Sequence, residues 1–414
     1  MDKQIEIKGL NRYCEIAVVG AGPTGLTVAL ALAHVGAEVA LIGPPPLPTS
    51  SQHPDTRTAA LLSSSVDLLK TLEVWDELAR HAAPLKAIRI IDASGGLLRA
   101  PDIEFKASEL GLEAFGYNIA NSVLVELLYA QAASALGLLQ PSSVERIELS
   151  PNHAVLSLKQ GMQITARLVV GADGRQSICR EQAGIGVSER RTDQATIATS
   201  FEHTEPHRGV STELHRRAGS VTTVPLTDPC ASSLIWVGET VEIDGLMRLD
   251  ETHFGTVLEE RLEGLLGRVG KVGARGHFPV APLVAKSLTG RRTALVGEAA
   301  HILPPLGAQG LNLGFRDGAT LADCVSMALK RRGDPGGEQV LSAYDSARKV
   351  DVLTRTFGMD LLSRSLLSSF LPLQAARGIV SHGLNALPPL RRLVMRIGMM
   401  PPTDLPSLMR PGAH

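Results

Sequence analysis

Apolar and polar residues alternate along this chain with two different periods, and the N-terminal part shows both of them. Ile16–Val19 form a short apolar run that ends at Gly20, which is typical of a buried parallel strand. Between Thr24 and Gly36 the apolar residues recur at helical spacing, and Val39–Ile42 form a second apolar run. The pattern predicts a strand, a turn, a helix and a strand in succession.

The rest of the chain changes between helical and strand periods several times. In chain order the pattern predicts a helix over 63–80, a hairpin over 85–106 that turns at Ser94-Gly95-Gly96, a helix over 123–136 capped by Asn121-Ser122, antiparallel strands over 143–171, a strand-rich region over 192–283, a third parallel strand over 292–297, and mostly helix after Gly337. Strand-rich insertions therefore separate the parallel strands in the sequence. Two interleaved domains explain this order better than two sequential ones.

Composition and charge restrict the class of protein. With 414 residues, 44% hydrophobic and 20% charged, the chain fits a globular enzyme of two or three structural units. A net charge of −1 does not support nucleic-acid binding. The four cysteines are scattered, so we expect a reducing compartment and no structural metal. The sequence has no signal peptide and no run of about 20 apolar residues. We therefore expect a cytoplasmic protein, with a peripheral position at the inner face of a membrane left open.

The turn after the first strand carries the first chemical motif. Gly20, Gly22 and Gly25 form GxGxxG between a strand and a helix, where the glycines allow a tight turn, the approach of a pyrophosphate and close helix packing. The motif in this context predicts a dinucleotide site. The acidic residue that usually ends the second strand is missing, because Gly43 occupies its place and Glu38 precedes the strand.

Two later segments repeat the change from strand to glycine turn. The run that ends in Gly171-Ala172-Asp173-Gly174 suggests either a cofactor contact or a cap of the next helix, and both stay open. After the strand at 292–297, Glu298 and His301 precede a proline- and glycine-rich loop that leads into a helix. Such a loop offers backbone donors and the positive end of a helix dipole to a group that becomes anionic. We expect it to line a flavin ring.

Together, GAGPTG, GADGRQS and GEAAHILPPLGAQGLNLGFRD resemble the three FAD motifs of the group A FAD-dependent aromatic hydroxylases. DTRTAALLSSSVDLLKTLEVWDEL and PPLGAQGLNLGFRD narrow the resemblance to the ubiquinone-biosynthesis hydroxylases. The resemblance implies an α/β fold like that of p-hydroxybenzoate hydroxylase, with a Rossmann-like domain interleaved with an antiparallel substrate domain. The implied boundaries are 1–83, 107–184 and 284–333 for the FAD-binding domain, 84–106 and 185–283 for the substrate-binding β domain, and 334–414 for a C-terminal helical region.

The resemblance also implies which residues contact FAD. The implied contacts are Gly20, Gly22, Gly25, Arg57, Asn121, Asp173, Glu298, Pro305, Gly307, Ala308, Gln309, Gly310, Leu311 and Asn312. Glu298 stands where the family commonly has an aspartate. His301 is the candidate for a general base toward the substrate, and packing beside the flavin is the alternative.

The function implied is ring hydroxylation of a polyprenylated phenol or quinol precursor of ubiquinone. FAD, reduced by NAD(P)H that binds transiently, would react with O2 to a C4a-hydroperoxide that the ring attacks. No second GxGxxG exists for the nicotinamide, so another electron donor stays open. Three other functions stay open as well: hydroxylation of a small soluble aromatic, reduction of a prenyl chain, and a non-catalytic flavin-binding role in a biosynthetic complex.

Two weaker patterns complete the analysis. His203, His207 and His215 are close in sequence, but Pro206 intervenes, so we expect an exposed loop rather than a metal site. Residues 351–414 contain seven basic and three acidic residues, and LRRLVMRIGMM places arginines among large apolar residues. That segment predicts an amphipathic helix that lies on anionic lipid or packs against the body of the protein.

Overall fold

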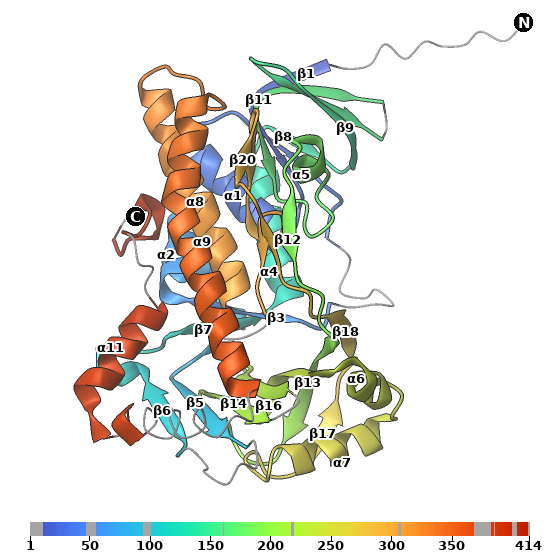
Figure 1. Cartoon of the computed structure of the whole chain (residues 1–414), viewed down its shortest axis with the longest axis vertical. Helices are drawn as coiled ribbons and strands as arrows, with labels where there is room; N and C mark the ends of the chain where they lie inside the picture. The colour runs from blue at the N-terminus through green and yellow to red at the C-terminus, as the bar shows by residue number, and fades with distance from the viewer. Residues whose placement is uncertain are drawn as a thin grey trace, which may run out of the picture.

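The computed structural model describes residues 11–46, 55–93, 101–159, 161–216, 219–304, 308–367, 382–384, 386–399 and 404–412, with the backbone alone for 355–367 and 399. Figure 1 shows one sheet with its helices in the upper part and a second sheet in the lower part. Loop 305–307 and the turn at Ser94-Gly95-Gly96 lie outside the described residues.

The upper sheet is built on parallel strands whose spatial order differs from their order in the sequence. β1 (Asn11–Val19) lies between β2 (Val39–Ile42) and β11 (Gln163–Gly171), while β21 (Thr293–Leu295) pairs with β11 and β8 (Leu138–Gln140) pairs with β2. The three strands predicted as parallel all belong to it. Their apolar residues are buried on both faces, as expected for parallel strands.

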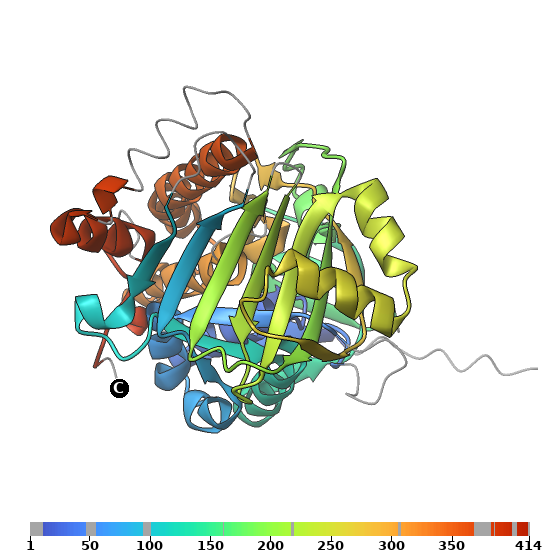
Figure 2. The ribbon, with the colours of Figure 1, turned by 90° about the horizontal axis from the view of Figure 1, so that it is seen from below.

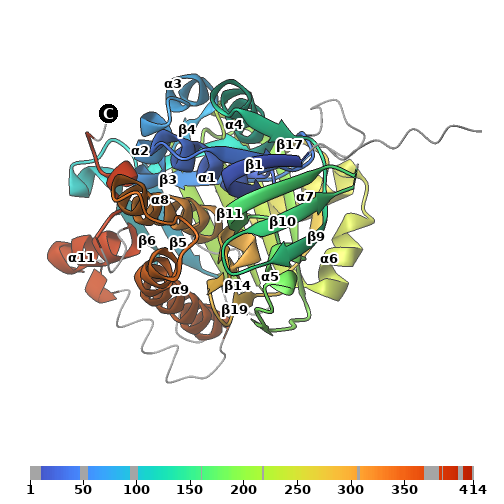
Figure 3. The ribbon, with the colours of Figure 1, turned by 90° about the horizontal axis from the view of Figure 1, so that it is seen from above.

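Helices cover this sheet and share one hydrophobic core with it. They are α1 (Pro23–His34), α4 (Asn121–Ala135), α5 (Ile178–Gln182), α8 (Gln309–Lys330) and α9 (Glu338–Leu367). Figure 3 shows α9 beside α8, which itself packs against α1. The predicted antiparallel strands at 143–171 extend the sheet as β9 (Val144–Leu149) and β10 (Ala154–Leu158), and β20 (Thr289–Gly290) pairs with β21.

The lower sheet is mostly antiparallel and combines two distant segments. Its strands, in spatial order, are β17 (Val269–Val272), β13 (Gln194–His203), β16 (Ala231–Glu239), β15 (Gly219–Pro225), β14 (Val210–Arg216), β5 (Ala87–Asp92) and β6 (Ile103–Lys106), with β18 (Gly276–Pro279) also on β13. The hairpin expected over 85–106 is β5 and β6. Because β5 pairs with β14, the insertion at 84–106 joins the sheet of the 185–283 insertion, and we propose the interleaved division on that basis.

The two faces of the lower sheet have different neighbours. Its outer face is covered by α6 (Thr240–Met247) and α7 (Glu251–Arg261), as Figure 2 shows. Leu214, Val221 and Trp236 form the core with these helices. The strand-rich prediction for 192–283 did not include α6 and α7. They are short and have weak apolar periodicity, and the sheet supplies their burial.

The inner face of the lower sheet lies against the FAD-motif part of the chain. Small sheets and short helices connect the two parts: β3 (Thr58–Leu62), β7 (Gly116–Ala120), β4 (Ala83–Pro84), β12 (Val187–Glu189), β19 (Leu283–Ala285), β22 (His301–Ile302), η1 (Ala79–His81), η2 (Ala107–Leu110), η3 (Gly297–Ala299), and η4 (Ser407–Met409). Thr58 Oγ1 lies 2.9 Å from Ser233 Oγ, and Asn118 donates to the carbonyl of Pro225 at 2.9 Å.

The single helix predicted over 63–80 is wrong. The chain forms α2 (Ser63–Thr71) and the short α3 (Trp75–Leu78), with a left-handed residue, Glu73 at φ 59°, between them. The Glu73 and Val74 amides bond back to the carbonyls of α2, which is how a Schellman turn closes a helix. Glycine usually takes the left-handed position. A glutamate there leaves no signal in the sequence.

The C-terminal helix α11 (Pro388–Met399) lies beside β6 at the edge of the lower sheet (Figures 1 and 2). Met395 is buried in a small cluster with Ala107 and Phe115. Among the described helices, none is both long and apolar enough to cross a bilayer.

Candidate active site

The GxGxxG turn has two glycines that the fold requires and one that it leaves free. Gly20 has φ 115°, and a Cβ on Gly25 would lie 1.9 Å from the carbonyl oxygen of Gly20. A Cβ on Gly22 would meet nothing within 4 Å, although Gly22 is the N-cap of α1. No side chain caps α1. The turn therefore presents the N-terminal amides of α1 to open space, which suits a phosphate.

Gly43, which stands where an acidic residue usually ends the second strand, also has a steric explanation. A Cβ at this position would lie 2.6 Å from the amide nitrogen of Ala21 and 2.8 Å from its Cβ. A ribose-binding acid at the end of β2 would thus press on the glycine turn. Glu38 does not replace it, because it precedes β2 and lies at the opposite end of the strand from the turn.

The three predicted motifs meet at one edge of the parallel sheet. Gly20 follows β1, Asp173 follows β11 and Gly297 follows β21, and these strands are neighbours. The Asp173 carboxylate accepts bonds from Ser177 Oγ at 2.6 Å and from the Cys179 amide at 3.0 Å. It therefore holds the start of α5, as the capping alternative expected, and its contact with FAD stays a prediction.

A second group of polar side chains surrounds the start of β3. The Arg57 guanidinium makes two hydrogen bonds of 2.8 Å to Asp55, whose carboxylate also accepts from Asn121 Nδ2 at 2.5 Å. The Arg57 side chain is half exposed. Its bond to Asp55 raises the pKa of Arg57, and the charge of Glu298 acts in the same direction. The predicted contacts Arg57, Asn121 and Glu298 thus form one charged neighbourhood, organised by Asp55, which the sequence analysis did not select.

The helix expected to be capped by Asn121-Ser122 begins differently. Asn121 is the first residue of α4, and its side chain bonds Asp55 instead of capping the helix. Its amide also donates to the carbonyl of Arg57 at 3.0 Å. Asn121 therefore ties α4 to the Arg57 segment.

Asn312 serves the fold of the site rather than presenting a free side chain. It is buried, its Oδ1 accepts from the Leu62 amide at 2.8 Å and Ser65 Oγ at 2.7 Å, and its Nδ2 donates to the carbonyls of Ala60 and Ala308. All of these bonds stay within the protein. Asn312 thereby joins the strand after Arg57 to the start of α8.

The start of α8 presents the positive end of a long helix dipole. Ala308 is left-handed at φ 53°, and no side chain caps the helix. Pro305 and Gly307, the other predicted flavin contacts, lie outside the described residues. The uncapped starts of α1 and α8, the space above Gly22 and half-exposed Arg57 fit an anionic dinucleotide such as FAD.

His301 is enclosed by protein. Its side chain has no exposed surface, and Nε2 lies 2.6 Å from Asp317, which also accepts from the Gly297 amide at 3.0 Å and from Arg348 at 2.7 Å. Arg348 continues to Asp351, which pairs with Arg316 at 2.9 Å. These buried ions connect the motif after β21 to α8 and α9. This placement is compatible with the packing alternative for His301, and its role toward the substrate stays a prediction.

The network keeps its carboxylates ionised. Burial by itself would raise the pKa of Asp317, but the charges of His301 and Arg348 together with hydrogen bonds hold it below its usual range. Burial likewise opposes the charge of Asp351, and the guanidinium groups of Arg348 and Arg316 hold its pKa far below the usual range.

The expectation of an exposed loop is wrong for His203 and His215, whereas His207 does lie in the loop between β13 and β14. His203 is buried on β13 and bonds Ser232 and a backbone carbonyl, while His215 is buried on β14.

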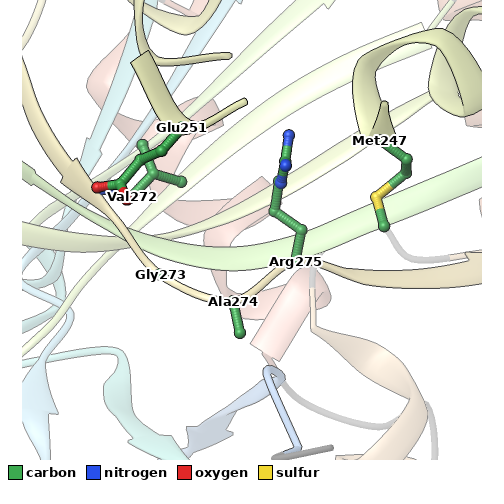
Figure 4. A pocket seen from close by; sticks show the side chains of 6 residues that line it. All are labelled: Met247, Glu251, Val272, Gly273, Ala274 and Arg275. Carbon is green, nitrogen blue, oxygen red and sulfur yellow. The ribbon is translucent and has the colours of Figure 1, made fainter. Parts of the chain in front are cut away.

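One hollow of about 350 Å³ lies beside α6 and α7, and Figure 4 shows its lining residues. Its polar groups are already used. Glu251 accepts from the Val272 amide at 3.0 Å, and Arg275 donates to the carbonyls of Leu246 and Leu249. The hollow offers no free catalytic group.

Comparisons with known proteins agree with this geometry. The family model described as "FAD binding domain" matches residues 13–354. Ubiquinone hydroxylase UbiL of Rhodospirillum rubrum is 32% identical over 94% of this chain and 90% of its own. The 3-demethoxyubiquinol 3-hydroxylase of Escherichia coli is 33% identical over 89% and 94%. Among solved structures, p-nitrophenol 4-monooxygenase PnpA from Pseudomonas putida DLL-E4 has a TM-score of 0.76 at 19% identity and covers 95% of this chain and 100% of its own.

The fold, the dinucleotide edge and these matches define a FAD-dependent monooxygenase. The chain belongs to the FAD-binding monooxygenase family, and it resembles the ubiquinone hydroxylases over most of its length.

Gly22→Ala and Gly25→Ala form a matched pair that separates binding from folding. Gly22→Ala is expected to weaken FAD binding at least about tenfold, since its methyl group enters the space over the turn, and to lower apoprotein stability by less than about 1 kcal/mol. Gly25→Ala is expected to lower stability by about 1–3 kcal/mol, because its methyl group meets backbone. Flavin titration and denaturation of the apoprotein measure both. Unchanged FAD affinity in Gly22→Ala would contradict the assignment.

Asp317→Asn is expected to lower the free energy of unfolding by about 3–5 kcal/mol, because Arg348 and Arg316 then share the single carboxylate of Asp351 in the core. The exposed pair of Glu77 and Arg80 is the control, and Glu77→Gln should cost less than about 1 kcal/mol. Since the pKa of Asp317 is lower in the folded chain, its contribution is present above the unfolded-state pKa of about 4 and is lost as the pH falls. Denaturant unfolding across pH measures this. An equal loss of unfolding free energy in Asp317→Asn and Glu77→Gln would contradict this role of Asp317.

Proposed function

We propose that this monooxygenase hydroxylates the aromatic ring of a polyprenylated phenol or quinol precursor of ubiquinone. The observation that carries the proposal is the similarity to two hydroxylases named for ubiquinone or its precursor, which extends over almost the whole length of each chain. The reductant proposed is NAD(P)H, binding transiently. Association with other enzymes of the same pathway is part of the proposal.

FAD supplies the activation of O2 when it is bound, and the task of the chain is to hold the ring in place and exclude water. Gly22 and the start of α1 would hold the pyrophosphate, and the start of α8 would lie at the edge of the flavin ring. The inner face of the lower sheet then forms the opposite wall for the substrate. A hydrogen bond between Thr58 of β3 and Ser233 of β16 joins this wall to the strand that follows Arg57.

Helix α11 supports a substrate with a long apolar tail. Leu390, Leu393, Val394 and Ile397 follow the spacing of one helical face, and they are 40%, 53%, 40% and 67% exposed. The opposite face holds the helix to the protein through Met395. On an ordinary surface helix the apolar stripe faces the core of the protein, whereas on α11 it faces solvent.

Arginines flank the apolar stripe. Arg392 and Arg396 are exposed, and Arg391 donates to Glu109 at 2.8 Å, which fixes α11 to the body. Cations beside a solvent-facing apolar stripe suit an anionic bilayer, where each contributes about 1 kcal/mol. We therefore propose that α11 lies in the surface of an anionic membrane.

The membrane helix proposed here is next to the substrate wall. Met395 packs in the same cluster as Ile88 of β5. Ile88 pairs with Ser211 in the strand register, so it lies on the inner face of the lower sheet, as Glu213 does. A prenyl chain could thus pass from the bilayer along apolar side chains while its ring reaches the inner face.

The substrate prediction is tested with ortho-geranylphenol and FAD-loaded protein. We expect a product that carries one atom from ¹⁸O2, with NAD(P)H oxidation that the phenol stimulates. Product formed without O2 would favour a prenyl reductase. Equal turnover of a phenol without the tail would favour a soluble aromatic substrate. FAD binding without phenol-stimulated reduction would favour a non-catalytic role.

The membrane prediction is tested by the double substitution Leu393→Glu and Ile397→Glu. Binding to vesicles that contain anionic phosphatidylglycerol should fall at least about tenfold, because two charges enter the apolar stripe. Val241→Glu, which changes an 84% exposed residue on α6, is the matched control and should leave binding unchanged. Vesicle sedimentation measures both, and equal binding by all three proteins would rule out α11 as the contact.

A further inference from the structure

The position of His301 leaves the polar contact for the substrate unassigned, so other acid–imidazole pairs are candidates. The described residues contain four contacts between a histidine nitrogen and a carboxylate. The pair of His253 and Asp250 is exposed on α7. The pair of His277 and Asp244 joins β18 to α6, on the outer side of the lower sheet. With His301 and Asp317 enclosed, Glu213 and His215 remain.

Strand alternation places Glu213 and His215 on the inner face of the lower sheet. Leu214 lies between them on β14 and packs in the core with Trp236 under α6 and α7. Residues before and after it must point to the opposite face. His215 Nε2 lies 3.3 Å from Glu213 Oε2.

The neighbours of Glu213 form a wall suited to an aromatic ring. In the strand register, Ile90 of β5 and Thr222 of β15 flank Glu213, and Ile235 of β16 follows Thr222. These strands are all interior in the sheet, yet Ile90, Glu213 and Ile235 keep some exposed surface. The inner face is therefore not sealed at this position.

The wall also faces the predicted FAD contacts. The Arg57 guanidinium lies 5.2 Å from the ring centre of Phe278, a residue whose strand register places it on the inner face through Thr196 and Val237. His215 belongs to the same row, through Ser220. The row that carries His215 thus reaches the Arg57 segment at its other end, through Phe278.

Among the described side chains, His215 is the group that pairs with Glu213, and no lysine or arginine does. The Glu213 side chain is 15% exposed and that of His215 is 6% exposed. A largely buried carboxylate is stabilised by polar groups that donate to it. A hydroxyl group of a bound ligand would be such a donor.

We propose that Glu213 binds the ring hydroxyl of the substrate and takes its proton during hydroxylation, and that His215 positions the Glu213 carboxylate. This inference rests on the proposed ring hydroxylation. A carboxylate that accepts a hydrogen bond from a hydroxyl makes a strong contact and orients the ring.

The step moves one proton and no electrons. The O–H bond of the ring hydroxyl breaks, a new O–H bond forms on Glu213, and the electron pair left on the ring oxygen raises the electron density of the ring. When the hydroxylated carbon loses its own hydrogen as a proton and the ring regains aromaticity, Glu213 returns its proton to the ring oxygen. The carboxylate is then restored.

The test compares a phenol with its methyl ether in FAD-loaded protein. With ortho-geranylphenol, Glu213→Gln is expected to hydroxylate about 100-fold more slowly and to release the O2 consumed as H2O2, while the phenol still stimulates FAD reduction. Glu213→Asp should keep part of the coupling. Thr212→Val, a buried change on the same strand that points to the opposite face, is the matched control and should behave as wild type.

The methyl ether, ortho-geranylanisole, has no proton to give. The ratio of H2O2 to product should therefore be the same for wild type and Glu213→Gln with this compound. His215→Gln should lower the coupling with the phenol and leave the ether unaffected, which a merely structural role would not do. Coupled hydroxylation by Glu213→Gln within threefold of wild type overturns the inference, as does an equal loss with the ether.

The two proposals fail in different ways. If the wild-type protein hydroxylates only a phenol without a prenyl tail, the substrate proposal fails, and the same comparison with that phenol and its methyl ether still decides the role of Glu213. If it hydroxylates no phenol, both proposals are overturned. Flavin content and unfolding of each variant identify a variant that does not fold, and Glu213→Asp then provides the comparison.

Discussion

Parallel pairing of β1 with β11, and of β11 with β21, is the constraint on which the site depends. Parallel strands run in one direction, so their carboxyl ends meet at one edge and the turns that follow them come together there. Three motifs that are far apart in the sequence become neighbours for this reason. Because β2 pairs on the other side of β1, the strand order reverses at Gly20 and leaves the space over the glycine turn uncovered.

Several polar side chains of the motifs make their hydrogen bonds within the protein itself. Asn312 joins the start of α8 to β3, Asp173 holds α5, and Asp317 with His301 holds the segment after β21. Buried polar groups require partners, and meeting that requirement fixes the loops in one geometry. What the edge offers to a ligand is backbone, at the helix starts of α1 and α8, which no side chain caps. A cofactor with phosphates and an anionic ring edge is served well by such donors.

The two faces of the lower sheet have different roles: the outer face packs in a hydrophobic core, and the inner face carries the residues proposed for the chemistry. Leu214, Trp236 and the other apolar residues of the outer face build a core with α6 and α7, while the inner face carries Glu213 and His215 toward the FAD motifs. Alternation along β14 makes both uses compatible, since successive side chains point to opposite faces. Helix α11 lies beside β6 at the edge of this sheet, two strands away from Glu213 on β14.

Local patterns in the sequence were enough for the elements and motifs that depend on neighbours in the chain. The apolar runs of β1 and β2, the hairpin of β5 and β6 and the glycine turn at Gly20 are of this kind, and so was the expectation of an α/β fold. Tertiary structure alone decided the rest. The left-handed Glu73, the short helices α6 and α7, the partner of His301 and the face on which Glu213 lies all depend on contacts between residues distant in sequence. Local periodicity does not contain those contacts, because a side chain's burial and its partners are set by the elements that pack against it.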